Sequence, residues 1–81
     1  MTSQEVKKLP QSFKSDYEED FQLLEEAEDS LNWNRTALRE CNGDDYDCAH
    51  YEQGIRFAKE RRDQALEMIK YNWERYGGNY E

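Results

Sequence analysis

The sequence has very little of what catalytic and metal sites are built from. It contains one histidine, two cysteines and one proline, and it has no glycine-rich loop of the kind that binds phosphate. Zinc sites usually need paired ligands with Cys-x-x-Cys spacing, which Cys41, Cys48 and His50 lack. The acidic residues between the cysteines do not follow the twelve-residue calcium pattern. We therefore expect no enzyme activity, no metal and no other cofactor.

Long apolar runs are also absent. No segment approaches the ~18 apolar residues that a membrane-spanning helix requires, and residues 1–10 lack the apolar stretch of a secretory signal. The net charge of −8 disfavours direct binding to nucleic acid or to an anionic membrane, because both are negatively charged. These features predict a cytoplasmic protein, in the producing or a host cell, that is attracted to basic surfaces.

Two stripes of apolar residues with helical spacing dominate the rest of the sequence. The first recurs every seven residues and the second alternates in steps of three and four. The first comprises Tyr17, Leu24, Leu31 and Leu38. The second comprises Tyr51, Ile55, Ala58, Arg62, Ala65, Ile69 and Tyr76. If the chain folds back between Cys41 and Cys48, the stripes face each other. The sequence therefore predicts an all-α fold, an antiparallel, coiled-coil-like hairpin of two helices.

Turn-forming residues and loss of periodicity set the predicted boundaries. The first residues are polar and contain the only proline, so we expect a flexible N-terminal arm there. The rest forms a single helical domain. The predicted ranges are 1–11 for the arm, 12–81 for the domain, about 13–41 for the first helix, about 42–47 for the turn and about 48–76 for the second helix. Ser15 and Glu18 have the spacing of a capping box, with Ser12 as the competing cap.

A lone pair of helices cannot enclose a core, and a chain this short buries only about 60% of its unfolded surface. We therefore expect two copies to dimerise into a four-helix bundle. Cys41 and Cys48 meet at the predicted turn about Gly43. A disulfide there would stabilise the fold by about 2–3 kcal/mol, whereas a reducing cytosol keeps thiols, and the sequence leaves both states open.

Charged residues interrupt both apolar stripes. Arg62 lies at the centre of the second stripe, where an unpaired charge is unfavourable. The hairpin register places Glu28 opposite it, so we predict a Glu28–Arg62 ion pair that fixes the register. Arg35 lies on the first stripe opposite Gly54. The missing side chain of Gly54 leaves room for it, or the helix is bent or shifted at that point.

Two sets of residues away from the stripes are candidates for binding a partner. Between Asp16 and Leu31 there are eight carboxylates and no basic residue. Such a face is either only solvated or a ridge that binds a basic groove by imitating the charge of nucleic acid. Four large apolar side chains project away from the stripes and belong to types that anchor interfaces. The predicted partner-binding residues are Glu18, Glu19, Glu25, Glu26, Asp29, Trp33, Phe57, Met68 and Tyr71.

The segment from Ser15 to Leu24 resembles the opening helix of the small acidic colicin-immunity proteins, which inhibit nuclease toxins. The resemblance covers about a tenth of the chain and implies an acidic inhibitor. Those proteins also carry adjacent tyrosines before a proline, which this chain lacks, so we do not assign it to that family. The favoured function is a non-enzymatic inhibitor or adaptor of the kind that viruses and mobile elements encode. The alternative is a structural component built by self-packing of hairpins.

Overall fold

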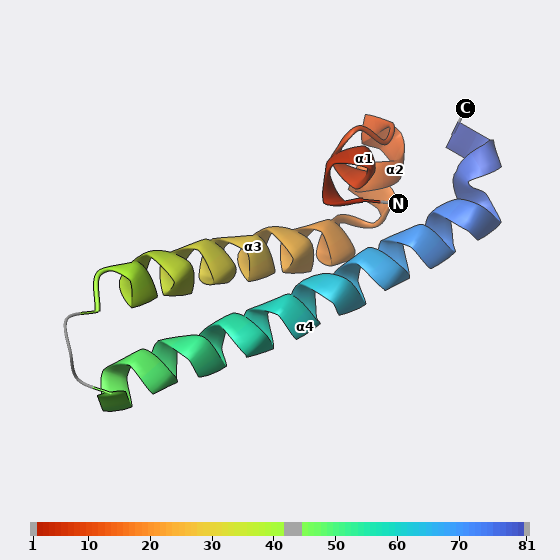
Figure 1. Ribbon diagram of the computed structural model, residues 1–81. Coiled ribbons are helices and arrows are strands. Elements are labelled where there is room, and N and C mark those ends of the chain that lie inside the picture. Colours follow the sequence, from red (N-terminus) through yellow and green to blue (C-terminus); the bar gives the residue numbers. More distant parts are fainter. Residues whose placement is uncertain (1, 42–44, 81) are drawn as a thin grey trace.

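The computed structural model describes residues 2–41 and 45–80, with side chains for all of these except 45–47. The elements in chain order are α1 (Ser3–Lys7), α2 (Gln11–Asp16), α3 (Glu18–Arg39), α4 (Asp45–Tyr76) and the 3₁₀ turn η1 (Gly77–Tyr80) (Figure 1). The described residues form helices and no strand, which confirms the predicted all-α class. The number of helices is larger than the two that the sequence predicted, because two short helices precede α3.

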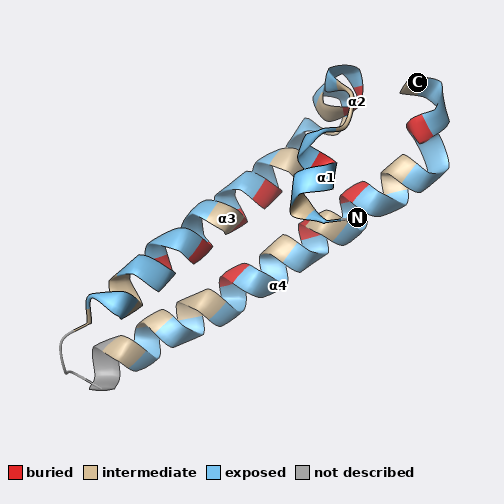
Figure 2. Cartoon of the chain, turned by 45° about the horizontal axis from the view of Figure 1, so that its top comes forward, coloured by how far each residue is buried: buried red, intermediate tan, exposed pale blue. Residues whose placement is uncertain are grey.

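The long helices α3 and α4 lie side by side and run in opposite directions (Figure 1). Buried residues recur along both of them (Figure 2). They are Leu24, Ala27 and Leu31 of α3, and Ala58, Ala65 and Ile69 of α4. Each fully buried leucine or isoleucine contributes about 1.5–3 kcal/mol. The alanines add little area, but their small side chains let the two helices approach closely.

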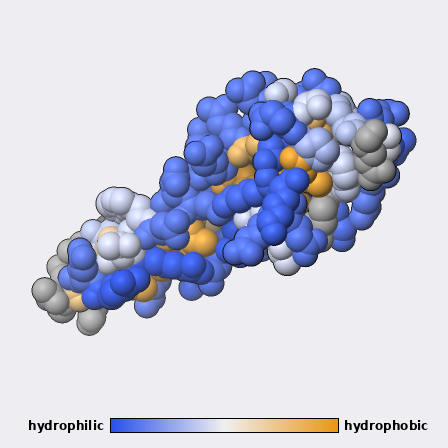
Figure 3. Space-filling model, turned by 90° about the horizontal axis from the view of Figure 1, so that it is seen from above, coloured by the Kyte–Doolittle hydropathy of each residue, from blue (hydrophilic) through white to orange (hydrophobic). Residues whose placement is uncertain are grey.

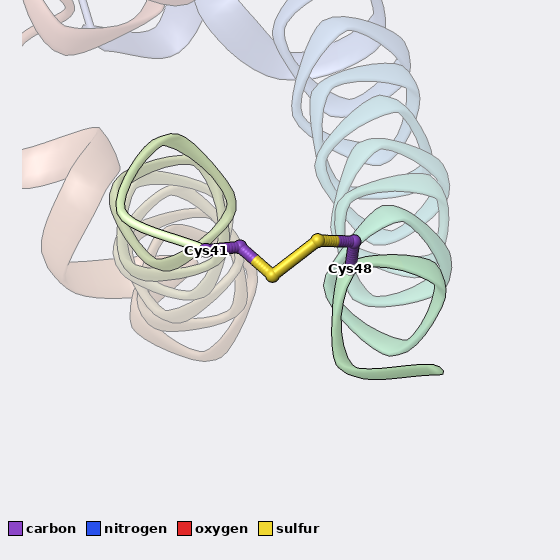
Figure 4. Close-up of a disulfide and its surroundings, with 2 residues drawn as sticks. All are labelled: Cys41 and Cys48. Atoms are coloured by element: carbon purple, nitrogen blue, oxygen red, sulfur yellow. A yellow bond between two sulfur atoms is a disulfide. The ribbon is translucent and has the colours of Figure 1, made fainter. Parts of the chain in front are cut away.

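Cys41 and Cys48 form a disulfide at the end where the chain passes from α3 to α4 (Figure 4). Their Cα atoms are 6.0 Å apart. The bond closes a short loop, and the entropy that it removes from the unfolded chain stabilises the fold by about 2–3 kcal/mol. The structure thus contains the bonded form of the two that the sequence left open. The turn predicted about Gly43 lies outside the described residues.

The N-terminal segment is folded, which corrects the prediction of a flexible arm over residues 1–11. Thr2 caps α1, because its hydroxyl accepts a hydrogen bond from the backbone N–H of Glu5. Val6 is fully buried in the core. A helix of five residues shows no periodicity in sequence, and it is stable only because tertiary packing holds it.

The first long helix also begins later than predicted. The helical backbone is interrupted at Tyr17, which separates α2 from α3. Ser12 and Ser15, the two candidate caps, both lie inside α2, and α3 begins after Tyr17 without a side-chain cap. The break turns α2 so that Phe13 enters the core.

An aromatic cluster holds both ends of the chain against the long helices. Phe13 is fully buried, and the centroid of its ring lies 4.7–6.1 Å from those of four other rings. These rings belong to Tyr17, Phe21, Trp73 and Tyr80. Leu66 of α4 packs against the same core. At the end of the α3–α4 pair far from the disulfide, one flank is therefore covered by α1, α2 and η1 (Figure 1).

The predicted Glu28–Arg62 ion pair is not formed. The Glu28 carboxylate instead pairs with Lys7 at 2.8 Å and accepts a hydrogen bond from the Ser3 hydroxyl at 3.0 Å. Arg62 pairs with its neighbour Asp63 at 3.4 Å. The predicted pair was wrong because residues 1–11 were expected to be an arm. They instead contain α1, which occupies the flank on which Glu28 lies. Since 29% of the Arg62 side chain is exposed, it remains hydrated without a partner in the seam.

Asn34, and not Arg35, faces Gly54. The Asn34 side chain is buried, and its Nδ2 atom donates to the carbonyl oxygen of Ser30 at 2.8 Å. A Cβ atom added at residue 54 would lie 2.4 Å from the Asn34 Oδ1 atom. Arg35 is exposed. The glycine therefore makes room for a buried amide rather than for a guanidinium group.

We predict that Gly54→Ala destabilises the protein by about 1 kcal/mol, measured as the free energy of unfolding in urea by circular dichroism. Overpacking costs about 1–3 kcal/mol, and the better helix propensity of alanine returns about 1 kcal/mol. In an Asn34→Ala background, the same substitution should stabilise instead, since the clash is gone. A stabilising effect of Gly54→Ala in the otherwise unchanged protein would contradict the close approach.

Candidate protein-interaction site

The acidic residues from Asp16 to Asp29, at the end of α2 and in the first half of α3, fall into two groups. Three of the eight carboxylates between residues 16 and 31 are bound within the molecule. Asp16 accepts a hydrogen bond from the Tyr80 hydroxyl, and Asp20 accepts one from Asn72 Nδ2 at 3.3 Å. Glu28 is held by α1, as described above. These three carboxylates connect different segments of the chain and therefore have a structural role.

The other five carboxylates are exposed on α3, and we call them the acidic ridge. They are Glu18, Glu19, Glu25, Glu26 and Asp29. Their side chains form no hydrogen bond or ion pair with any residue that the structure describes. Seen from above, the surface is mostly hydrophilic, with only small hydrophobic areas (Figure 3). The ridge consists of the same five acidic residues that the sequence predicted as partner-binding.

Asp20 shows how the ridge affects its neighbours. Burial raises the pKa of the Asp20 carboxyl, and the nearby charge of Glu19 raises it further, while the hydrogen bond from Asn72 lowers it. Like charges that are close together disfavour each other's ionised form. A cation placed against this part of α3 would relieve that repulsion.

The four predicted apolar contact residues are all exposed. Trp33 is 64% exposed, and Phe57, Met68 and Tyr71 are each more than half exposed. The Trp33 ring makes an edge contact with Tyr51, at 5.8 Å between centroids. The structure adds a fifth residue that sequence reasoning missed, Leu23, which is 55% exposed. Its angular position on α3, about 100° from Leu24, was the signal that could have found it.

A groove of about 380 Å³ lies between α3 and α4. Its apolar lining residues are Leu23, Ala27, Ala65 and Met68. Its polar lining residues are Asp20, Glu26 and Ser30 on α3, and Arg61 and Gln64 on α4. We call this side of the helix pair the open flank. Residues two positions apart on a helix project about 160° from each other, so Met68 lies opposite Leu66 and Leu23 opposite Phe21. The open flank is thus the side that α1, α2 and η1 leave uncovered.

Neither a metal centre nor a membrane span is found in the part of the chain that the structure describes. No group of three or more histidine, cysteine, aspartate or glutamate residues there could hold a metal ion. None of the helices in residues 2–41 and 45–80 is long and apolar enough to cross a bilayer. Comparisons with protein-family models, curated proteins and solved structures return no match. The geometry of the acidic ridge and the open flank therefore carries the functional interpretation.

The Tyr80–Asp16 hydrogen bond leads to a prediction about pH. This bond is the main reason why the pKa of Tyr80 is raised to about 12. Because the folded pKa is raised, the stabilisation is fully present below about pH 10, the ordinary pKa of tyrosine. It is lost as the pH rises through the folded pKa. We expect an absorbance titration of tyrosinate to show a component near pH 12 that disappears in Tyr80→Phe.

The matched control for this titration is Tyr76→Phe, which removes an exposed phenol near the same end of the chain. This variant should keep the component near pH 12. If Tyr80→Phe keeps that component as well, the hydrogen bond to Asp16 does not control the titration.

Proposed function

We propose that this protein is a non-enzymatic interaction module, an inhibitor or adaptor whose acidic ridge binds a basic surface of another protein. The observation that carries the proposal is that some of the carboxylates between residues 16 and 31 are hydrogen-bonded within the fold and the others are not. Three are bound within the fold, whereas five remain exposed on one helix with no partner among the described residues. Charges kept together in this way repel each other, and a basic partner removes that repulsion.

The spacing of the ridge supports the imitation of nucleic acid. Glu18 and Asp29 are separated by a helical rise of about 16 Å. Five charges span this length in four intervals of about 4 Å on average, and a single strand of B-DNA carries one phosphate per about 3.4 Å. A groove that binds a phosphate backbone would thus meet a similar density of charge on α3. We therefore propose that the target of the inhibitor is a nucleic-acid-binding protein.

We also propose that the protein works as a homodimer in which two helix pairs pack into a four-helix bundle. The support is the row of large exposed apolar residues on α3 and α4, which gain from being covered. The same residues support the second candidate function, an assembly component that packs repeatedly against itself. Light scattering over a range of protein concentrations separates the two. A fixed small oligomer supports the interaction module, and open-ended growth supports the assembly component.

The function is tested by capture of a partner from the native cell on immobilised protein. The variant Glu18→Gln/Glu19→Gln/Glu25→Gln/Asp29→Asn should lose a basic partner that the unmodified protein retains. Retention should also fall between about 0.1 M and about 1 M salt, as the screening length falls from about 10 Å to about 3 Å. Added duplex DNA should displace the partner if the ridge occupies a nucleic-acid-binding groove.

The matched control neutralises four exposed glutamates on α4 and changes the net charge by the same amount. These residues are Glu52, Glu60, Glu67 and Glu74. The control variant should retain the partner. Equal loss in both variants would show that only total charge matters, and retention that does not depend on salt would contradict a charged interface.

A further inference from the structure

Exposed apolar residues lie at two levels along α3 and α4, and one of the two pairs, Leu23 and Met68, lines the open flank. The contacts of Asn34 with Gly54 and of Asp20 with Asn72 fix the register between α3 and α4. This register places Trp33 level with Phe57, and Leu23 level with Met68. The two apolar pairs are separated by a helical rise of about 15 Å, and all four side chains are more than half exposed. A partner for the open flank must therefore offer apolar groups at the level of Leu23 and Met68.

Opposite charges line the two walls between these levels. Glu26 lies on the α3 wall of the groove and Arg61 on the α4 wall. Both are exposed, and neither forms an ion pair with another residue in the described ranges. The open flank therefore has an acidic side and a basic side, each with a charge that no other described residue pairs.

We propose that the open flank binds the open flank of a second copy, about a two-fold axis parallel to the long helices. This inference builds on the homodimer proposed above and assigns its interface. The axis places α3 of one copy over α4 of the other at the same level. Leu23 of each copy then meets Met68 of the other across the interface. Glu26 of each copy faces Arg61 of the other, so that the interface contains two symmetric ion pairs.

The alternative two-fold axis, perpendicular to the helices, also brings apolar residues together. It places α3 over α3, however, so that Glu26 and the other acids of one copy approach the acids of the second. Like charges opposed across an interface are unfavourable by several kcal/mol in close contact. Electrostatics therefore selects the axis parallel to the helices, in which the two disulfides lie at the same end of the dimer.

The test is sedimentation equilibrium of charge-reversal variants, with circular dichroism to confirm that each is folded. Glu26→Arg and Arg61→Glu should each weaken dimerisation about tenfold or more, because each creates two like-charge pairs. The double variant Glu26→Arg/Arg61→Glu should restore the dissociation constant to within about threefold of the starting value. The matched controls, Glu60→Arg and Arg56→Glu, make the same charge changes at exposed positions outside the groove and the acidic ridge and should leave it unchanged.

Several results would overturn the interface. They are a monomer at all concentrations, open-ended association, controls that weaken the dimer as much as the test variants, and a double variant that remains as weak as the single ones. Met68→Glu provides an independent check and should also weaken the dimer. Arg61→Glu leaves the acidic ridge intact. Salt-dependent capture of a partner by this variant therefore reports on the ridge alone, so failure of the dimer interface and failure of the proposed function can be distinguished.

Discussion

The packing of α3 against α4 determines which side chains are available for any other purpose. Leu24, Leu31 and Ile69 are buried where the helices meet, and alanines between them allow the close approach. Once this seam is fixed, every other position on either helix has a defined direction. The acids of α3 that lie away from the seam become the ridge, and the residues beside the seam form two flanks. The angular position of a residue around its helix thus decides whether it belongs to the seam, to the acidic ridge or to a flank.

The two flanks differ because the ends of the chain cover only one of them. The Phe13 ring contacts four other aromatic rings. Through these contacts α2 packs against α4 and η1. Lys7 of α1 neutralises Glu28 on the same side. The opposite flank keeps its apolar residues and its unpaired Glu26 and Arg61 exposed. The asymmetry leaves the open flank exposed, and this is the surface that we propose a second copy covers.

Much of the arrangement of α3 and α4 follows from local sequence patterns. Seven-residue spacing identified Leu24 and Leu31 as inward-facing, and the same angular reasoning placed Trp33 and Met68 outward. The acidic ridge was visible because its charges lie close together in the sequence, with no basic residue between them. These features depend only on helical period and on the type of side chain, which the sequence contains directly.

The parts that sequence reasoning missed depend on contacts between distant segments. Nothing near Val6 indicates that it will be buried, because its partners lie in other helices. The Lys7–Glu28 ion pair could not be found while residues 1–11 were treated as an arm. Asn34 was overlooked as a seam residue because buried amides are uncommon, and it is tolerated here only since Gly54 leaves space and Ser30 accepts its hydrogen bond.

The side-by-side placement of α3 and α4 is tested most directly by a distance between their outer faces. Spin labels at exposed positions Gln22 and Lys70, in a variant with both cysteines replaced by serine, are measured by pulsed electron resonance. Labelled protein is diluted with unlabelled protein so that only distances within one chain contribute. Packed helices whose axes are about 8–10 Å apart predict a narrow distribution of distances near 20 Å. A separation near 70 Å, as in one continuous helix at about 1.5 Å per residue, would contradict the account.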